Sequence, residues 1–213
     1  MTQLRRFLQD KSCVFAESFG DLQYVRNRHT VTGNPTICNS PWGKAMVLDG
    51  TNDYLTLTGI NEQRVRFNAA TDDFSIVIIA RPDSDDAAYL LDKCDGADLG
   101  WTLYTTGSAS LGLCIGHSPN FSYTAENSFV IGGWHVIVAS VDRDAANRLY
   151  INGSASGTVD NPESEVTTNS VSPRIGATAY DGTGKFAGAV QSLLIYSRYV
   201  SVQEAANFYT VAF

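Results

Sequence analysis

The chain has 213 residues, which fits one domain, because all-β domains commonly reach this length undivided. Fifteen basic and 22 acidic residues give a net charge of −7, and no basic run is longer than Arg5–Arg6, so the composition argues against a nucleic-acid partner. No apolar run approaches the roughly 20 residues of a membrane-spanning helix, so we expect no membrane insertion.

The first part of the chain, residues 1–44, lacks regular periodicity and is predicted to be an N-terminal arm with the first strand or strands. Val14 to Phe19 alternates apolar and polar residues at first, which is typical of an edge strand. The N-terminus has a basic pair but no apolar core and no cleavage site of an export signal, so we expect a protein completed in the cytoplasm.

The four cysteines show neither paired spacing nor a histidine at zinc-binding spacing. We therefore expect four reduced thiols rather than disulfides. They are Cys13, Cys38, Cys94 and Cys114.

From residue 45 onward the chain follows a rhythm of short strands and turns, typical of a two-sheet sandwich. Asp49 to Asn52 predicts a hairpin-like turn, and Asn152-Gly153 predicts a type I′ turn. Three segments are apolar at both odd and even positions and are predicted to be central strands covered on both faces: Phe74–Arg81, Trp134–Asp142 and Phe186–Tyr196.

The C-terminal segment predicts one short helix. Ser201 and Glu204 stand in the register of a capping box, and apolar residues follow at helical spacing. The fold predicted from the chain is thus an all-β, antiparallel two-sheet sandwich over residues 45–213 with a short C-terminal helix.

Five segments in order resemble the LamG-like jelly rolls of the concanavalin A-like lectin/glucanase superfamily. They are Leu48–Tyr54 (LDGTNDY), Phe74–Pro82, Gly133–Ile137, Asn147–Gly153 and Ile175–Ala205. The resemblance runs from about Ser40 to Tyr209 and implies a jelly-roll sandwich. It implies several functions, because this fold serves in glycan-binding and adhesive modules, in virion surface proteins and, with added carboxylates, in glycosidases.

Catalytic residues of a glycosidase are not recognisable in the chain. Retaining glucanases pair two carboxylates about 5 Å apart on one strand face. Glu163 and Glu165 are the nearest to such a pair, but Ser164 separates them in a polar loop. The three histidines accompany no nucleophile motif. We therefore predict a protein that is not an enzyme.

Two groups of aspartates are candidates for a calcium site, because Ca²⁺ prefers several oxygen ligands. The first is the loop Asp92, Asp95 and Asp98; the second is Asp49 with Asp53. Asp83, Asp85 and Asp86 form another acidic loop, and solvated turn residues are the favoured interpretation of this loop and of the Asp92 loop. Gln191 replaces the acid that helps to hold a structural calcium ion in the glucanases that the chain resembles, which weakens a site there.

Candidate glycan-binding residues are exposed aromatic side chains beside polar groups, since sugar CH groups stack on rings and hydroxyls form hydrogen bonds. Tyr180-Asp181-Gly182 is the best such cluster, and we expect Tyr180 to be exposed. Tyr104 and Tyr123 lie on successive predicted strands and are further candidates, whereas Trp101 is predicted to lie in the core.

The function predicted from these features is that of a non-enzymatic virion surface component, such as a decoration, fibre or tail protein. Its expected partners are other virion proteins and glycans, and we expect a homo-oligomer in the virion. The arm of residues 1–44 is expected to dock on its own sandwich or on a neighbour and to anchor the protein to a larger particle, and residues 1–24 are expected to be dispensable for folding. The alternatives are a glycan-binding module of a secreted or cell-surface protein, located outside the cell, and a divergent glycoside hydrolase.

Overall fold

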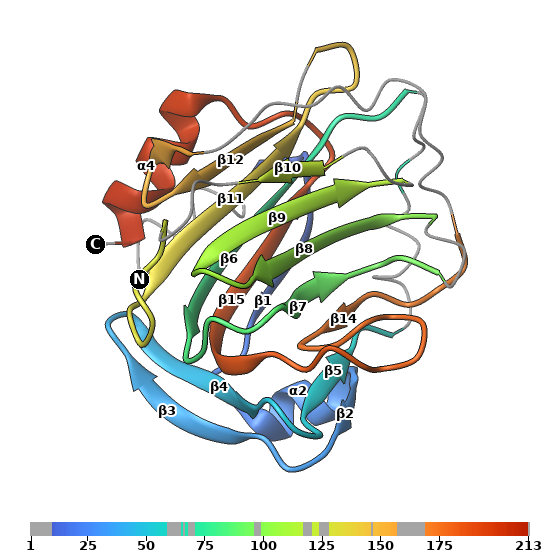
Figure 1. Cartoon of the computed structure of the whole chain (residues 1–213), viewed down its shortest axis with the longest axis vertical. Helices are drawn as coiled ribbons and strands as arrows, with labels where there is room; N and C mark the ends of the chain where they lie inside the picture. The colour runs from blue at the N-terminus through green and yellow to red at the C-terminus, as the bar shows by residue number, and fades with distance from the viewer. Residues whose placement is uncertain are drawn as a thin grey trace.

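A computed structural model of the whole chain describes residues 10–58, 65, 67, 71–95, 99–116, 121–123, 128–145, 147–156 and 169–212, of which 121–123 and 211–212 by their backbone alone. Two antiparallel sheets pack face to face, and one helix follows at the C-terminus (Figure 1). The predicted two-sheet sandwich with a C-terminal helix is confirmed. None of the helices in the described ranges has the length and hydropathy of a membrane span.

The eight-stranded sheet contains the three strands predicted to be central. They are adjacent in the order β11 (His135–Val141), β6 (Phe74–Pro82) and β15 (Ala187–Tyr196). The complete order is β13 (Ser154–Ala155), β12 (Arg148–Ile151), β11, β6, β15, β4 (Gly43–Asp49) and β3 (Thr36–Ser40), with β1 (Cys13–Ser18) pairing with β15.

The seven-stranded sheet lies in front of the other sheet in Figure 1. Its order is β10 (Phe121–Tyr123), β9 (Ser110–Ile115), β8 (Trp101–Thr106), β7 (Ala88–Asp92), β14 (Arg174–Ile175), β5 (Tyr54–Thr56) and β2 (Thr30–Thr32). The short strand β14 pairs with β7 on one side and with β5 on the other. Strand β5 lies about 120 residues before β14 in the chain.

The main core fills the space between the two sheets. Trp101 is fully buried there, as predicted, and its ring lies 5.7 Å from that of Phe74. A second apolar cluster lies on the other face of the eight-stranded sheet, where Val77, Val138 and Leu194 pack with Phe208 of the helix α4 (Val202–Ala212). Burial on both faces explains why β6 and β11 are apolar at odd and even positions alike.

The helix α4 begins with the predicted capping box. The backbone N–H of Glu204 donates to Ser201 Oγ at 3.3 Å, and the N–H of Ser201 donates to the Glu204 carboxylate at 3.0 Å. The helix has 11 residues, which is longer than the one or two turns expected.

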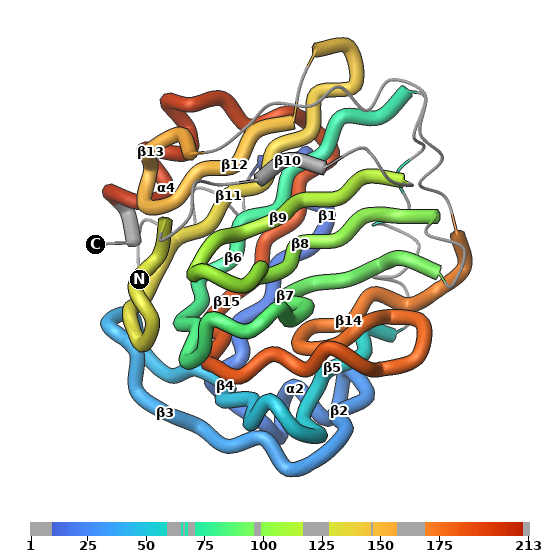
Figure 2. Tube along the Cα trace, viewed as in Figure 1, coloured from blue at the N-terminus to red at the C-terminus, as the bar shows by residue number. Residues whose placement is uncertain are grey.

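Residues 10–44 belong to the same sandwich. Strand β1 pairs with β15, as Figure 2 shows for the blue and red traces, and Phe15 and Phe19 are buried in the main core. The predicted edge strand is confirmed. The boundary expected after residue 44 falls inside β4, which pairs with β3, so no separate arm begins in the described part of this segment.

A seven-residue helix, α2 (Leu22–Arg28), lies in this segment and was not predicted from the sequence. The Asp21 carboxylate caps it by accepting hydrogen bonds from the N–H groups of Gln23 and Tyr24. Only Val25 of the helix is buried, so the helix carries no recognisable apolar stripe.

All four cysteines are free thiols in the structure. Burial raises the pKa of the Cys94 thiol far above its usual range, which keeps that side chain protonated.

Candidate functional site

The outward face of the seven-stranded sheet carries Tyr104, and the loop that holds Tyr180 and Asp181 is bonded to the same sheet. On β8, Trp101 and Leu103 point into the core, so the alternating Thr102 and Tyr104 point outward. The same alternation on β9 directs Gly112 outward. We call this surface the outer face.

Two tyrosine rings lie side by side on the outer face. Tyr89 on β7 pairs with Tyr104 on β8, and their half-buried rings lie 6.1 Å apart with an interplanar angle of 31°. The Tyr104 ring covers Gly112, because a Cβ atom at that glycine would lie 2.4 Å from Tyr104 Cζ. Tyr123 is the Cα partner of Gly112 on β10, and its side chain lies outside the described part of the chain. The strand register therefore places predicted Tyr104 and Tyr123 in one cross-strand row.

The loop 176–186 lies against this row. Tyr180 at its tip is 67% exposed, so its predicted exposure is confirmed. The N–H of Tyr89 donates to Gly184 O at 3.0 Å, and Gly184 packs directly against the Tyr89 ring. In Figure 1 the loop runs beside β14 and β5. The exposed ring and the tyrosine row thus belong to one surface.

Asp181 shapes the loop from within. Its Oδ1 accepts hydrogen bonds from the hydroxyl of Thr178 and from both the N–H (2.9 Å) and the hydroxyl (2.8 Å) of Thr183. These bonds, the one from Thr178 foremost, lower the pKa of Asp181 to about 2. The carboxylate that was predicted to contact a ligand therefore also holds the turn that presents Tyr180.

Asp92, the first calcium candidate, is buried beneath the loop. Its carboxylate accepts hydrogen bonds from the N–H of Ala179 at 2.5 Å, from the N–H of Cys94 at 3.2 Å and from the Thr102 hydroxyl. Burial is the largest cause acting on the carboxyl and raises its pKa. Asp92 thus joins the loop to β7 and β8.

The remaining calcium candidates also accept backbone hydrogen bonds. Asp49 caps the turn that follows it, Asp53 accepts from the N–H of Asn34 at 2.6 Å, and Asp95 accepts from a neighbouring loop N–H at 3.0 Å. Asp98 lies outside the described residues. Within the described ranges, no three His, Cys, Asp or Glu residues form a group that could hold a metal ion. The calcium site stays a prediction.

The residues weighed for catalysis include Glu163, Glu165 and His135. Glu163 and Glu165 fall outside the described part of the chain. His135, on the eight-stranded sheet, holds a turn: its Nε2 lies 3.1 Å from the backbone N–H of Val130, and its Nδ1 lies 3.1 Å from Asn152 Nδ2. Burial lowers the pKa of His135, so the imidazole stays neutral near pH 7.

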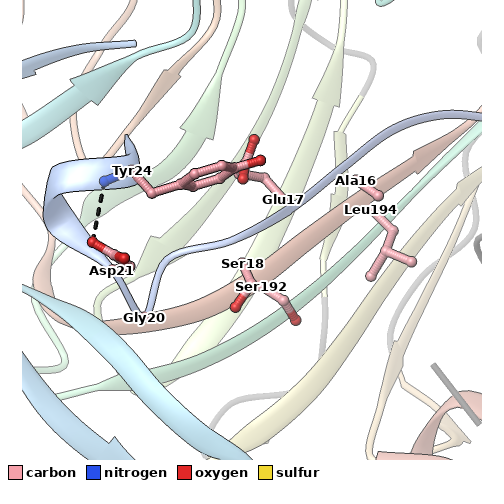
Figure 3. Close-up of a pocket in the computed structure, with 8 residues that line it drawn as sticks. All are labelled: Ala16, Glu17, Ser18, Gly20, Asp21, Tyr24, Ser192 and Leu194. Carbon is pink, nitrogen blue, oxygen red and sulfur yellow. Dashed lines mark hydrogen bonds between the residues drawn. The ribbon is translucent and has the colours of Figure 1, made fainter. Parts of the chain in front are cut away.

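A cleft of about 410 Å³ lies elsewhere, between α2 and the paired strands β1 and β15. Figure 3 shows Tyr24 of α2 extending toward Glu17, with Ser18 and Ser192 beside each other on the two strands. Glu17 is buried and lies 3.3 Å from Arg28 Nε. The cleft was not predicted, because it depends on the pairing of strands about 170 residues apart.

A family model described as the concanavalin A-like lectin/glucanases superfamily matches residues 49–206. No curated protein matches the chain. Among solved structures, the binding domain of Paraclostridial Mosquitocidal Protein 1 is similar, with a TM-score of 0.73 and 17% identity over 93% of this chain and 52% of that one.

Two further structures share the fold. Domain 4 of AbnA, a GH43 extracellular arabinanase from Geobacillus stearothermophilus, solved with arabinotriose, has a TM-score of 0.64 and 18% identity over 95% of this chain and 98% of that one. The binding domain of botulinum neurotoxin serotype D/C has a TM-score of 0.70 and 12% identity over 95% of this chain and 52% of that one. The chain therefore spans about half the length of the two toxin domains and nearly all of Domain 4.

Proposed function

Because the chain belongs to the concanavalin A-like lectin/glucanase superfamily, we propose that it is a non-catalytic glycan-binding module whose ligand lies on the outer face. The observation that carries the proposal is Tyr180, which is 67% exposed on a loop held against the Tyr89 ring. Exposed tyrosine rings offer sugars a flat apolar surface with a polar edge.

The loop is well suited to present that ring. Asp92 and Asp181 bind its backbone from below and from within, and the N–H of Tyr89 binds it from the side. A ring that is already held in place loses less conformational freedom when a ligand binds, so more of the contact energy contributes to affinity.

The similar folds support a sugar ligand. Domain 4 of AbnA was solved with arabinotriose, and the toxin structures are binding domains. Arabinotriose is therefore the first probe for this chain.

The glycoside hydrolase remains the alternative. This alternative is considered because the same fold also occurs in glycosidases. The two aspartates near Tyr180, Asp92 and Asp181, already accept the hydrogen bonds that shape the loop. We propose a binding role because both carboxylates serve the architecture of the site.

The setting of the module is a further part of the proposal. A virion surface component, bound to other virion proteins as a homo-oligomer, fits a glycan-binding face, and a secreted or cell-surface protein is the alternative setting. Light scattering of the purified chain tests the homo-oligomer, and the mass of the native particle that co-purifies with the protein tests the virion.

The binding proposal is tested by titration calorimetry with arabinotriose, after a glycan array has widened the choice of sugars. Tyr180→Ala is compared with Tyr24→Ala, a 45% exposed tyrosine at the cleft of the other sheet. We expect Tyr180→Ala to weaken binding at least about tenfold, which corresponds to about 1.4 kcal/mol, and Tyr24→Ala to bind like the wild type.

The reverse result, with binding lost in Tyr24→Ala and kept in Tyr180→Ala, would move the site to the cleft and contradict the outer face. A protein that binds no sugar on the array would refute the glycan-binding role. Release of reducing ends from an oligosaccharide would establish the hydrolase instead.

A further inference from the structure

Two cations stack on one tyrosine beside the Tyr180 loop. The guanidinium carbon of Arg174 lies 5.0 Å from the centroid of the Tyr54 ring, and the Lys185 ammonium lies 4.7 Å from it. Arg174 is on β14, directly before the loop 176–186, and Lys185 lies near the end of that loop. Both charges therefore lie where the loop joins the sheet.

The polar ends of these three side chains converge on a glycine of the loop. A Cβ atom on Gly182 would lie 3.2 Å from Arg174 Nη1, 3.6 Å from Lys185 Nζ and 3.6 Å from the Tyr54 hydroxyl. Gly182 has φ of +77°, a conformation that favours glycine. We call Tyr54, Arg174, Gly182 and Lys185 the cationic cluster.

Neither cation is neutralised by an acid of the described residues. Arg174 Nη1 donates to the carbonyl of Thr178 at 2.9 Å, and its buried Nε has no hydrogen-bond partner there. The ion pairs found in the described ranges leave out both Arg174 and Lys185.

The two carboxylates that are bonded to the loop already accept other hydrogen bonds. Asp92 is the Cα partner of Arg174, but both of its oxygens accept hydrogen bonds from loop and strand groups. Asp181 accepts from Thr178 and Thr183. Two neighbouring positive charges repel each other, and an anion bound between them relieves that repulsion.

We propose that the cationic cluster binds the carboxylate of an acidic sugar, a uronic or sialic acid, at one end of the glycan site. This inference rests on the proposed function, because the sugar ring is held by Tyr180, two residues before Gly182. A planar guanidinium matches a carboxylate in shape, and the ammonium adds a second donor. The net charge of −7 disfavours heavily sulfated or nucleic-acid polyanions, so a single carboxylate fits better.

The test uses two matched pairs of probes in titration calorimetry on the whole chain. One pair is trigalacturonate and galactotriose, and the other is sialyllactose and lactose. We expect the acidic member of one pair to bind at least about tenfold tighter at low salt, with the preference shrinking as salt rises. The pair that shows the preference identifies the acid as uronic or sialic.

Variants assign the preference to the cluster. Lys185→Gln is expected to lower the affinity for the acidic probe about tenfold and to leave the neutral probe unchanged. Lys44→Gln, an exposed lysine on β4 of the other sheet, is the control and is expected to change neither affinity. Arg174→Gln repeats the test at the second cation.

Equal affinity for acidic and neutral probes in the wild type would overturn the inference, and so would a preference that persists in both Lys185→Gln and Arg174→Gln. Neutral binding that still depends on Tyr180 would leave the proposed function standing in either case. If the wild type bound none of the acidic or neutral sugars, both proposals would be refuted together.

Discussion

The carboxylate of Asp92 and the backbone N–H of Ala179, 87 residues apart in the chain, are joined by a hydrogen bond of 2.5 Å. The same buried carboxylate accepts the N–H of Cys94 and the hydroxyl of Thr102. Three segments of the chain therefore meet at one acid, and the loop that exposes Tyr180 is fixed to the sheet through it.

Replacing Asp92 with alanine removes the acceptor of these three hydrogen bonds, and the buried N–H of Ala179 loses its partner. We expect Asp92→Ala to lower the free energy of unfolding by about 1–3 kcal/mol and to speed hydrogen exchange at the Ala179 amide. Asp83→Ala is the control, since it removes a partly exposed ion pair with Arg81 that is worth about 0–1 kcal/mol. Unchanged exchange at Ala179 would contradict the role of Asp92.

The pH dependence of stability reports on the same carboxyl. Burial raises the pKa of Asp92 above its ordinary value of 3.8. The folded protein then holds this proton more tightly, so the stabilising contribution is complete below 3.8 and is lost as pH rises through the folded-state pKa. Urea unfolding should show the stability of the wild type, relative to Asp92→Asn, falling as the pH rises above about 4. A constant or rising difference would contradict the raised pKa.

Gly112 tests the tyrosine row. In Gly112→Ala the new methyl group meets the Tyr104 ring, the movable end of a side chain, so we expect the ring to shift and sugar affinity to fall. The melting temperature should change by no more than about 4 °C, the effect of roughly 1 kcal/mol in a domain of this size. Gly107→Ala is the matched control, because a Cβ there meets no atom within 4 Å. Equal affinities in both variants would exclude Tyr104 from the site.

Because β1 packs in the sandwich, we expect the N-terminal segment to be needed for folding, whereas the sequence alone suggested that residues 1–24 are dispensable. Phe15 is 4% exposed in the main core, and its strand pairs with β15. Phe15→Ala should cost about 3–5 kcal/mol in urea unfolding. Deleting residues 1–24 removes strand β1 and should abolish the cooperative transition. A folded protein after the longer deletion would contradict the packing of β1.

Calcium is tested by the melting temperature. Asp49, Asp53 and Asp92 already accept backbone hydrogen bonds, so we expect chelator and added calcium to leave the melting temperature unchanged. An ion bound to the native state must raise stability. A rise with calcium that disappears in Asp98→Asn would establish the predicted site.

Local chemistry was enough to predict much of the architecture. Phe74–Pro82 and His135–Val141 are central strands because apolar residues at both parities require cover on both faces. Asn152 and Gly153 both have positive φ in the predicted turn, and Ser201 with Glu204 forms the predicted cap. Each of these features depends on residues only a few positions apart, so the local sequence pattern is enough to predict it.

The site depends on contacts between distant segments. Asp92 reads as a solvated or calcium-binding loop acid in the sequence, and the strand pairing with β14 buries it under residue 179 instead. Tyr54, Arg174 and Lys185 come together only because β5 pairs with β14, about 120 residues later in the chain. The spacing of these three residues in the chain follows no strand or helix period. Pairing between distant strands is selected by the packing of the whole core and not by neighbouring residues, so it could not be predicted from the sequence.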